Sequence, residues 1–490
     1  MKRLSLAALG SVPAEYRPAT APQQRQVRIV HLGIGAFHRA HQAFYTEACG
    51  GWGICGVTQR TDAVVHQLAP QDCLYTLLVR GSAIDGTARP LVIGAVREVV
   101  FAGADPAAVP ARIAGPEVTV VTLTVSEKGY RHDPATGALR LGDPEIAADL
   151  AGRPPRTVVG QLAAGLAARA AAGAGPLTVL CCDNLPSNGP TLEGLTGQYV
   201  RRMPGGDRLA GWIAESVTFP ATMVDRITPA TAGADRAEVA RLLGVTDHAA
   251  VVAEPFTQWV IEDRFAAARP AWEKAGAQVV PEVTPYETVK LRMLNGAHSA
   301  LAYIGGLAGY DYIADAVADD SLAGYARRLM DDDVAPALAP PPDLDLEEYA
   351  EEVLRRFSNP ALRHRTRQVA MDGSQKLPQR LLGTVRDRLA AGAQPVQAAL
   401  AVAAWMRHIA TGRTEDGRPF PPDDPLAPLL GERLAGAGDP AGVTAALLGV
   451  TEVFGDLSAS GTLRDLLTDL LARLSRDGVH HTVRALSQAS

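Results

Sequence analysis

The chain has 490 residues, of which 47% are hydrophobic and 20% charged, enough for two or three globular domains with sizeable cores. Its 47 Lys and Arg against 53 Asp and Glu give a formal net charge of −6, and no long basic run occurs. This balance argues against nucleic acid or an anionic membrane as a partner, and no apolar stretch approaches the ~20 residues of a membrane span.

The five cysteines are odd in number, and no C-x-x-C pair occurs among them. This usage indicates reduced thiols rather than a disulfide framework, and it gives no cysteine-based zinc site. We therefore expect a cytoplasmic protein without a structural metal.

The first strong element is a buried strand over residues 27–32, followed by a glycine turn that leads into a helix. Such a turn lets the backbone approach a pyrophosphate, and the helix N-terminus attracts its charge. The third glycine of the usual dinucleotide fingerprint is replaced by His38, and His38 and Arg39 are either phosphate ligands or surface residues of the first turn. The residues expected to bind the cofactor here are Gly33, Ile34, Gly35, Ala36, Phe37, His38 and Arg39.

A second strand is expected at residues 52–58, and its end should carry an acid for the adenosine ribose if the cofactor is NAD. The chain offers Asp62 for this role. Arg60 is equally placed to meet a 2′-phosphate, so residue chemistry leaves NAD and NADP open.

Further β-rich runs at 117–124 and 177–182, with an Ala-rich helix at about 158–173 between them, predict a doubly wound parallel sheet. After residue 285 the strand signal fades. The fold class is therefore α/β, with a Rossmann-like dinucleotide-binding domain at 1–283 and a mostly α-helical substrate domain at 284–490. The second domain should hold helices at about 286–305, 318–331, 346–357, 378–391, 394–411, 440–454 and 460–476.

Two polar segments lie between the strands of the first domain. Asn184 and Asn188 follow the strand at 177–182, where a turn built from Asn, Pro and Gly is the structural alternative to a binding role. Asp225 and Arg226 are adjacent, and on their own they read as a structural ion pair of small energetic weight.

The segment from Thr284 to His298 has the strongest chemical pattern. Thr284 with Glu287 resembles a capping box, and apolar residues then recur at helical spacing. On a wheel of about 100° per residue, Lys290, Asn295 and His298 fall within roughly 140° of one another. Burial lowers the pKa of a lysine, which would let Lys290 take a proton from an alcohol. The alternatives are a solvated Lys290, a core His298, and a Glu287 that only caps the helix.

A cationic segment follows at residues 364–380, which suits a polyhydroxy or carboxylate substrate, with a solvated charged surface as the alternative. The carboxylate partners that we cannot separate by sequence are Arg365, Arg367, Lys376 and Arg380.

Several of these segments together resemble the mannitol dehydrogenase family, the polyol-specific long-chain dehydrogenases. The resemblance rests on Lys290-x-x-x-x-Asn295-x-x-His298, on the segment from Val217 to Pro229, and on the motifs at 33–41 and 183–189. It implies that Asn184, with Asn188 second, lies beside the reacting oxygen, and that Asp225 and Lys376 contact substrate. It also favours NAD. Gln368 stands where mannitol 2-dehydrogenases have Arg, so the pattern is more similar to the fructuronate reductase (mannonate oxidoreductase) branch.

The resemblance implies an NAD-dependent, metal-independent oxidoreductase that interconverts a secondary alcohol and a ketone. Lys290 is the expected acid and base, Asn184 and Asn295 hold the oxyanion, His298 orients a hydroxyl, and Glu287 relays the proton. D-mannonate and D-fructuronate are the expected substrates, with Arg365 and Lys376 binding them. The alternatives are mannitol or arabinitol dehydrogenase, zinc-dependent alcohol chemistry and, less favoured, a non-catalytic dinucleotide-binding regulator. The only partner expected is the small-molecule substrate, in a monomer or small homo-oligomer.

Overall fold

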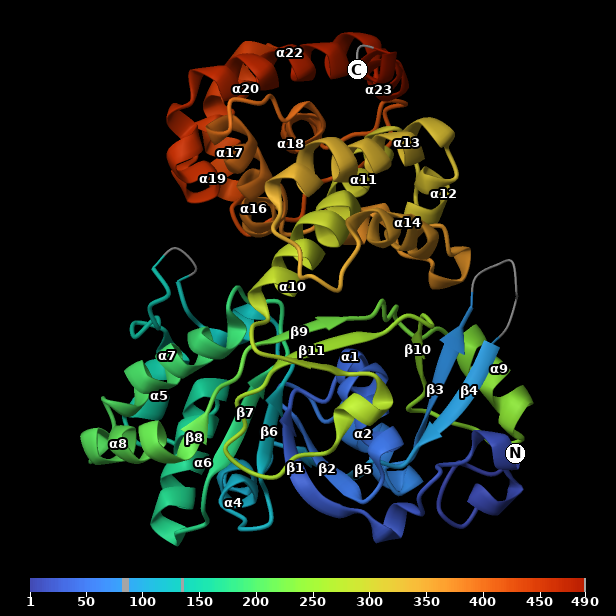
Figure 1. Cartoon of the computed structure of the whole chain (residues 1–490), viewed down its shortest axis with the longest axis vertical. Coiled ribbons are helices and arrows are strands. Elements are labelled where there is room, and N and C mark those ends of the chain that lie inside the picture. Colours follow the sequence, from blue (N-terminus) through green and yellow to red (C-terminus); the bar gives the residue numbers. More distant parts are fainter. Residues whose placement is uncertain (82–87, 134–135, 489–490) are drawn as a thin grey trace. The chain divides into compact units, whose positions relative to one another are not determined.

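The computed structural model describes residues 1–81, 88–133 and 136–488. These residues divide into two compact units, one that ends at Thr284 and one that begins at Pro285 (Figure 1). The first holds the sheets and the second is helical.

The first unit is built on a six-stranded parallel sheet with the strand order β5-β2-β1-β6-β7-β8. Its strands have almost continuous apolar sequences because helices cover both faces of such a sheet. The order reverses at β1, and ligands bind at the carboxyl ends of strands beside such a switch point. The doubly wound sheet is therefore confirmed. Its strands are β1 Gln26–Leu32, β2 Trp52–Thr58, β5 Val96–Phe101, β6 Val120–Leu123, β7 Leu177–Cys181 and β8 Val217–Thr218.

The predicted Ala-rich helix is α6, Val158–Ala172, which packs between α4, Ala108–Ile113, and α7, Asn188–Val200. The Thr157 hydroxyl accepts the Gly160 N–H at its start, and Gly173 ends it in the left-handed region. Local capping and an apolar face therefore define this helix.

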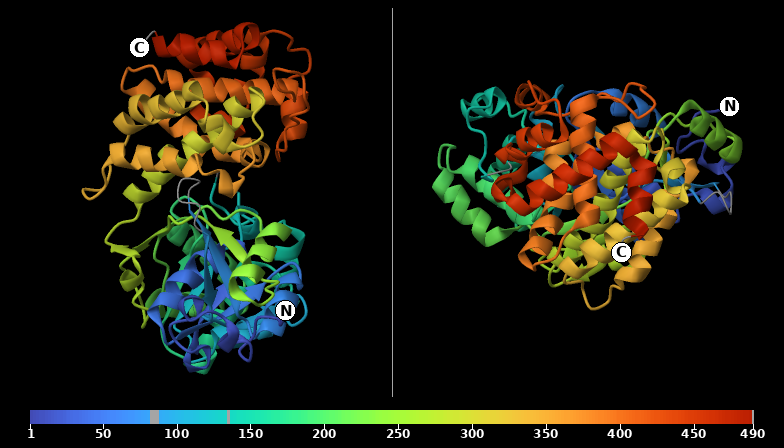
Figure 2. Two further views of the ribbon diagram at one scale, coloured as in Figure 1. Left: turned by 90° about the vertical axis from the view of Figure 1, so that its right-hand side faces the viewer. Right: turned by 90° about the horizontal axis from the view of Figure 1, so that it is seen from above.

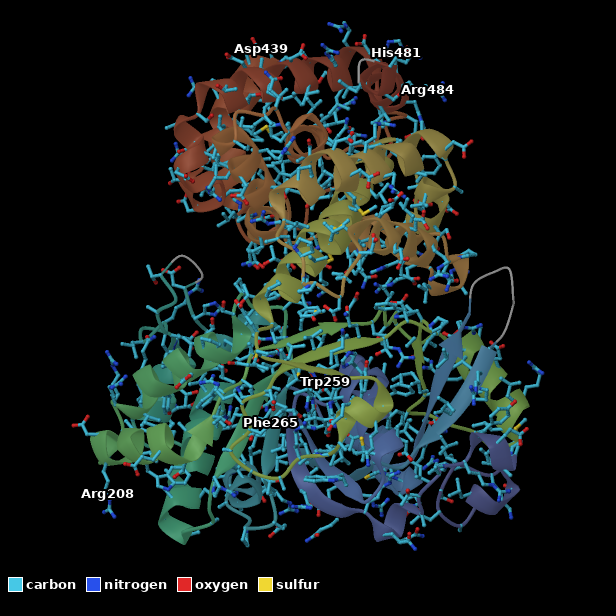
Figure 3. The ribbon with its side chains drawn as sticks, in the orientation of Figure 1. Arg208, Trp259, Phe265, Asp439, His481 and Arg484 are labelled. Atoms are coloured by element: carbon cyan, nitrogen blue, oxygen red, sulfur yellow. The ribbon has the colours of Figure 1, made fainter. Side chains whose placement is uncertain are left out.

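Two three-stranded sheets in the first unit were not expected from the sequence. Their orders are β10-β3-β4 and β12-β11-β9, and their short strands give a weak alternation signal. In the second sheet Trp259, labelled in Figure 3, is fully buried with its ring 4.6 Å from that of Trp272. The strands are β3 Tyr75–Arg80, β4 Ala88–Ile93, β9 Thr222–Asp225, β10 Val251–Ala253, β11 Gln258–Glu262 and β12 Gln278–Val280.

The second unit is helical around α11, Asn295–Leu307, in which every residue is buried. Helix α18, Val396–Thr411, packs against α11 and also against α22, Gly461–Asp477, so these helices form successive layers (Figure 2). Other helices surround them: α12 Ile313–Val317, α13 Asp320–Arg328, α14 Leu346–Phe357, α15 Thr366–Ala370, α16 Gly373–Leu377, α17 Gly383–Ala390, α19 Ala427–Arg433, α20 Pro440–Leu448, α21 Thr451–Phe454 and α23 Val479–Gln488.

The predicted helix at 286–305 is not one regular α-helix. Helix α10, Thr284–Val289, leads into a π-helical turn, Lys290–Leu294, before α11 begins. Similar π turns occupy Leu329–Val334 and Pro378–Leu382, within two other stretches that were predicted as regular helices. Apolar spacing of three to four residues does not reveal such insertions, and π turns are frequent at functional sites.

No single helix in the described part of the chain is long and apolar enough to cross a membrane. Helix α20, together with the segment Thr451–Ala459, meets the length and composition test as a pair bent by 67°. Both members contribute buried side chains, including Leu447 and Val453, to the core of the second unit.

Candidate active site

The π turn decides how Lys290 and Asn295 are placed. The Asn295 N–H donates to the Lys290 carbonyl, a hydrogen bond between residues five apart. In a regular α-helix the two side chains would point about 140° apart, whereas a π turn brings residue i+5 above residue i. The sequence predicted side-chain directions spread over roughly 140°, whereas the π turn brings the side chains of these two buried residues closer to one direction.

His298 lies almost one α-helical turn beyond Asn295 and is buried. Its ring stacks on that of Phe357, with centroids 4.8 Å apart, and approaches the His364 ring at 4.7 Å. Burial lowers the pKa of His298 well below its usual value, and the nearby His364, Arg380, Lys376 and Arg356 lower it further. The imidazole is therefore neutral at physiological pH.

Two polar atoms of this segment lack a hydrogen-bond partner among the described residues. They are Asn295 Nδ2 and His298 Nε2, and both are buried. Buried polar groups in native proteins are nearly always satisfied, so an unsatisfied pair on one short segment calls for an explanation. A bound polyhydroxy compound would supply the missing oxygen atoms.

The cations of the segment 364–380 differ in what their side chains contact. Lys376 Nζ donates to the Val369 carbonyl, and Arg380 donates to Ser299 Oγ at 3.0 Å, so both reach α11 or its surroundings. Arg365 is exposed, and its guanidinium lies 5.3 Å from the centre of the Tyr312 ring. Among the cations of the 364–380 segment, Lys376 and Arg380 are those that lower the pKa of His298, and the expected substrate role of Arg365 stays a prediction.

The segment after β7 uses most of its polar groups to hold its own fold. Asn188 Nδ2 donates to the carbonyls of Asp183 and Thr222, and its Oδ1 accepts the Thr222 N–H at 2.9 Å. Asn188 is 2% exposed. This buried amide holds the local fold, and its expected role in substrate binding stays a prediction, whereas the neighbouring Asn184 is exposed.

Asp183 connects the ends of two strands. Its carboxylate accepts hydrogen bonds from the N–H groups of Val125 and Ser126 and from the Tyr130 hydroxyl at 2.6 Å. Burial raises the pKa of Asp183 to about 6, although the hydrogen bond from Tyr130 opposes that rise. Ser126 has a φ of 71°, a strained value for a residue with a side chain. Asp183 therefore holds a strained turn at the carboxyl end of β6.

Asp225 is buried at the end of β9, beside Arg226. The guanidinium of Arg226 donates to the carbonyls of Glu254 and Ala40 and lies over the Phe44 ring. Burial lowers the pKa of Arg226 to about 10, partly offset by Glu254. Arg226 is thus fixed largely by backbone carbonyls.

The glycine turn after β1 fits a dinucleotide phosphate. Gly33 has a φ of 99°, and a Cβ there would stand 2.1 Å from the Thr124 carbonyl oxygen, so only glycine fits. At Gly35, by contrast, the nearest atom to an added Cβ would be the Gly33 carbonyl oxygen, at 3.8 Å. The backbone at Gly35 is exposed at the start of α1, Ala36–Ala40, and open to a close approach.

The side chains of His38 and Arg39 are not surface residues of the first turn. His38 is fully buried, with its ring stacked 3.4 Å from that of His31. Arg39 donates to the carbonyls of Ala249 and Gly35 and lies near the Tyr75 ring. Both side chains lie in the interior of the first unit, so the surface alternative is wrong, and their expected role in binding phosphate stays a prediction.

Asp62 precedes helix α3, Ala63–Leu68, and its exposed carboxylate lies 3.1 Å from His66 Nε2. It lines a cavity of about 610 Å³ together with the last three residues of β5. Among the described residues, no group of three or more His, Cys, Asp or Glu side chains is arranged to hold a metal ion.

Sequence reasoning missed three residues around His298. Arg356 and Phe357 end a helix about 60 positions away, and His364 begins the cationic segment 364–380, in which it was assigned no role. Spacing along the chain carries no signal for such contacts. Glu287 is half-buried in α10. This helix begins at Thr284, whereas a Thr284 that caps the helix would stand one position before its first residue.

Comparison with known proteins identifies the family of the chain. Residues 27–274 match the model of the mannitol dehydrogenase Rossmann domain, and residues 282–474 match the mannitol dehydrogenase C-terminal domain. The chain is 46% identical to the uncharacterized oxidoreductase YeiQ of Escherichia coli over 90% of both chains. It is 41% identical to the D-mannonate oxidoreductase of the same organism, over 96% of this chain and 98% of the relative. The mannitol 2-dehydrogenase of Pseudomonas fluorescens, solved with NAD and D-mannitol, superposes with a TM-score of 0.90 at 37% identity, over 100% of both chains.

Proposed function

The chain belongs to the mannitol dehydrogenase family and is a polyol or sugar-acid dehydrogenase, and from this premise we propose that it interconverts D-mannonate and D-fructuronate with NAD. One observation carries the choice of a sugar acid. In addition to burial and the His364 ring, the cations Arg380, Lys376 and Arg356 lie close enough to His298 to lower its pKa. A substrate carboxylate would offset the positive potential of these three cations, and a neutral polyol would not.

In the proposed reaction Lys290 removes the proton of the substrate hydroxyl. Burial favours the neutral form of an amine, which is the form that accepts a proton. NAD would be held at the Gly33–Phe37 backbone, and it would supply the hydride acceptor for the carbon that carries this hydroxyl, with NADH as the hydride donor in reduction. In that direction the protonated Lys290 supplies the proton to the ketone oxygen.

Asn295 is proposed to donate Nδ2 to the oxygen that carries the developing charge. Such preorganised donors are commonly worth ~3–4 kcal/mol. The proposal is supported by the π turn that places Asn295 above Lys290, and by the lack of any partner for Nδ2 among the described residues. Asn184 is proposed as a second donor and His298 as the residue that orients a neighbouring hydroxyl.

The remaining assignments rest on the family resemblance together with the local geometry. Asp225 and Lys376 are proposed to bind substrate, and Glu287 to relay the proton. The Gly33–Phe37 backbone is proposed to hold the pyrophosphate and Asp62 the adenosine ribose, which favours NAD over NADP.

The five free cysteines support a cytoplasmic setting, and a monomer or small homo-oligomer is proposed.

A mannitol or arabinitol dehydrogenase is the second candidate. The similarity to a structure that contains D-mannitol favours it. Gln368, the residue at which this chain departs from the mannitol 2-dehydrogenase pattern, is exposed.

The test is oxidation of NADH by the purified protein with D-fructuronate and D-fructose side by side, in the presence of EDTA. Turnover of fructuronate alone supports the sugar-acid proposal. Turnover of fructose alone refutes it in favour of the polyol alternative, and loss of activity with EDTA would refute a metal-independent reaction.

A further inference from the structure

His364 lies on a strap of backbone that is fixed before α15. Its carbonyl accepts the Ile313 N–H at 2.9 Å, and the Thr366 N–H donates to the Asp311 carbonyl at 3.0 Å. Between them, Tyr312 and Arg365 form an isolated antiparallel bridge. These contacts fix the backbone on both sides of His364.

The ring approaches that of His298 at 4.7 Å, with 58° between the ring planes. Each of the two imidazoles has one buried nitrogen without a hydrogen-bond partner among the described residues, Nε2 in His298 and Nδ1 in His364. Two unsatisfied nitrogens on neighbouring rings form a paired site for ligand oxygens.

The surroundings of this pair are cationic. Desolvation, and after it the charge of Lys376 on α16, lower the pKa of His364 to about 4. His298 is affected by burial first, then by His364, Arg380, Lys376 and Arg356. Both rings are therefore neutral at pH 7, and each can donate a hydrogen bond through its protonated nitrogen.

We propose that His364 binds the carboxylate of the sugar acid, with Lys376 as the cation that balances its charge. This inference rests on the proposed function, and it adds a recognition residue to which no role has been assigned. His298 would remain available to the hydroxyl groups beside the reacting carbon, so the two rings share the substrate.

The binding of an anion has a consequence for protonation. A carboxylate beside His364 stabilises the imidazolium and raises the pKa of His364 from about 4. Between pH 7 and pH 5 the complex then takes up a proton, so the affinity for the acid increases as the pH falls.

The experiment is steady-state reduction of D-fructuronate by the wild-type enzyme, His364→Leu and His364→Asn at pH 7 and pH 5. We expect His364→Leu to raise KM roughly 10- to 100-fold, as for a lost hydrogen bond to a charged group, with kcat and NADH affinity nearly unchanged. His364→Asn keeps an amide near the Nδ1 position, and its KM should lie between those of the wild type and His364→Leu. Only the wild type should show a KM that decreases toward pH 5.

The matched control is Arg363→Gln on the same strap. Arg363 is exposed, and it donates to the Tyr312 hydroxyl at 2.9 Å. Arg363→Gln should leave KM and its pH dependence as in the wild type. This control separates the effect of losing His364 from the effect of losing a positive charge on the same segment.

The outcomes separate this inference from the proposed function. If the wild type does not reduce fructuronate, the proposed function fails and the inference fails with it. If the wild type does reduce it, but KM in His364→Leu is unchanged, His364 does not bind the carboxylate. If His364→Leu does not fold, the pH dependence of KM in His364→Asn decides, and a dependence equal to that of the wild type overturns the inference.

Discussion

Two asparagines in similar-looking polar motifs have opposite surroundings. Asn188, after β7, donates to two carbonyls and accepts the Thr222 N–H, so its amide is bonded at both ends. Asn295, after the π turn, has an Nδ2 without a partner among the described residues. The first amide stabilises the fold, and the second is available for chemistry.

The comparison shows that residue type alone does not assign a role. Both asparagines are buried and both belong to motifs of the same family resemblance. Their hydrogen bonds distinguish them, because a satisfied buried group contributes to stability and an unsatisfied one requires a ligand.

The largest expected effect is at Lys290, which begins the π turn. Lys290→Ala removes the proposed acid and base, and we expect kcat to fall at least ~10²–10⁴-fold with NADH affinity retained. Stopped-flow or steady-state kinetics and NADH fluorescence measure the two quantities. Lys274→Ala, at an exposed lysine of the first unit, is the control and should keep wild-type kcat. Normal turnover in Lys290→Ala would refute the mechanism.

A second prediction concerns Asp183, in the segment of the bonded asparagine. Its pKa of about 6 in the folded protein lies above its usual 3.8, so the folded protein binds more protons than the unfolded chain between these values. The stability contributed by Asp183 is therefore greatest below pH 4 and decreases as the pH rises to 6, by up to about 3 kcal/mol.

Thermal unfolding of wild type and Asp183→Asn between pH 4 and pH 7 tests this sign. The variant has no carboxylate to titrate, so its Tm should change less over this range after allowance for the other acids. Parallel pH profiles in the two proteins would exclude Asp183 as the titrating group.

The smallest effect is expected at Arg365, which the sequence suggested as a substrate residue. Because its exposed guanidinium lies over Tyr312, Arg365→Gln should change kcat/KM for fructuronate less than about 3-fold, a change below 1 kcal/mol. A 100-fold decrease in kcat/KM would show instead that Arg365 contacts the substrate.

The sequence predicted the central strands well. β1, β2, β6 and β7 lie in apolar runs with turn residues at their ends, and such runs are visible in a single sequence. The strands of the two small sheets, which have three to six residues each, were missed because their formation depends on tertiary pairing.

Three features of the site could not be predicted. The π turn at Lys290 leaves the apolar spacing almost unchanged, so a regular helix was the natural interpretation. His38 and Arg39 look like solvent-exposed residues in sequence, yet the short α1 directs them into the interior. The ring contact of His298 with His364 joins residues 66 positions apart, beyond any local pattern.

The most direct test of the central claim compares Asn295→Ala with Asn188→Ala, measuring kcat and Tm for both. We expect Asn295→Ala to lower kcat ~10²–10³-fold with little change in Tm, because its Nδ2 has no described partner to lose. Asn188→Ala should instead destabilise the protein by roughly 2–4 kcal/mol through its unpaired carbonyl and N–H partners, while the folded fraction keeps its kcat. Equal losses of kcat in both variants, or a larger Tm loss in Asn295→Ala, would contradict the account.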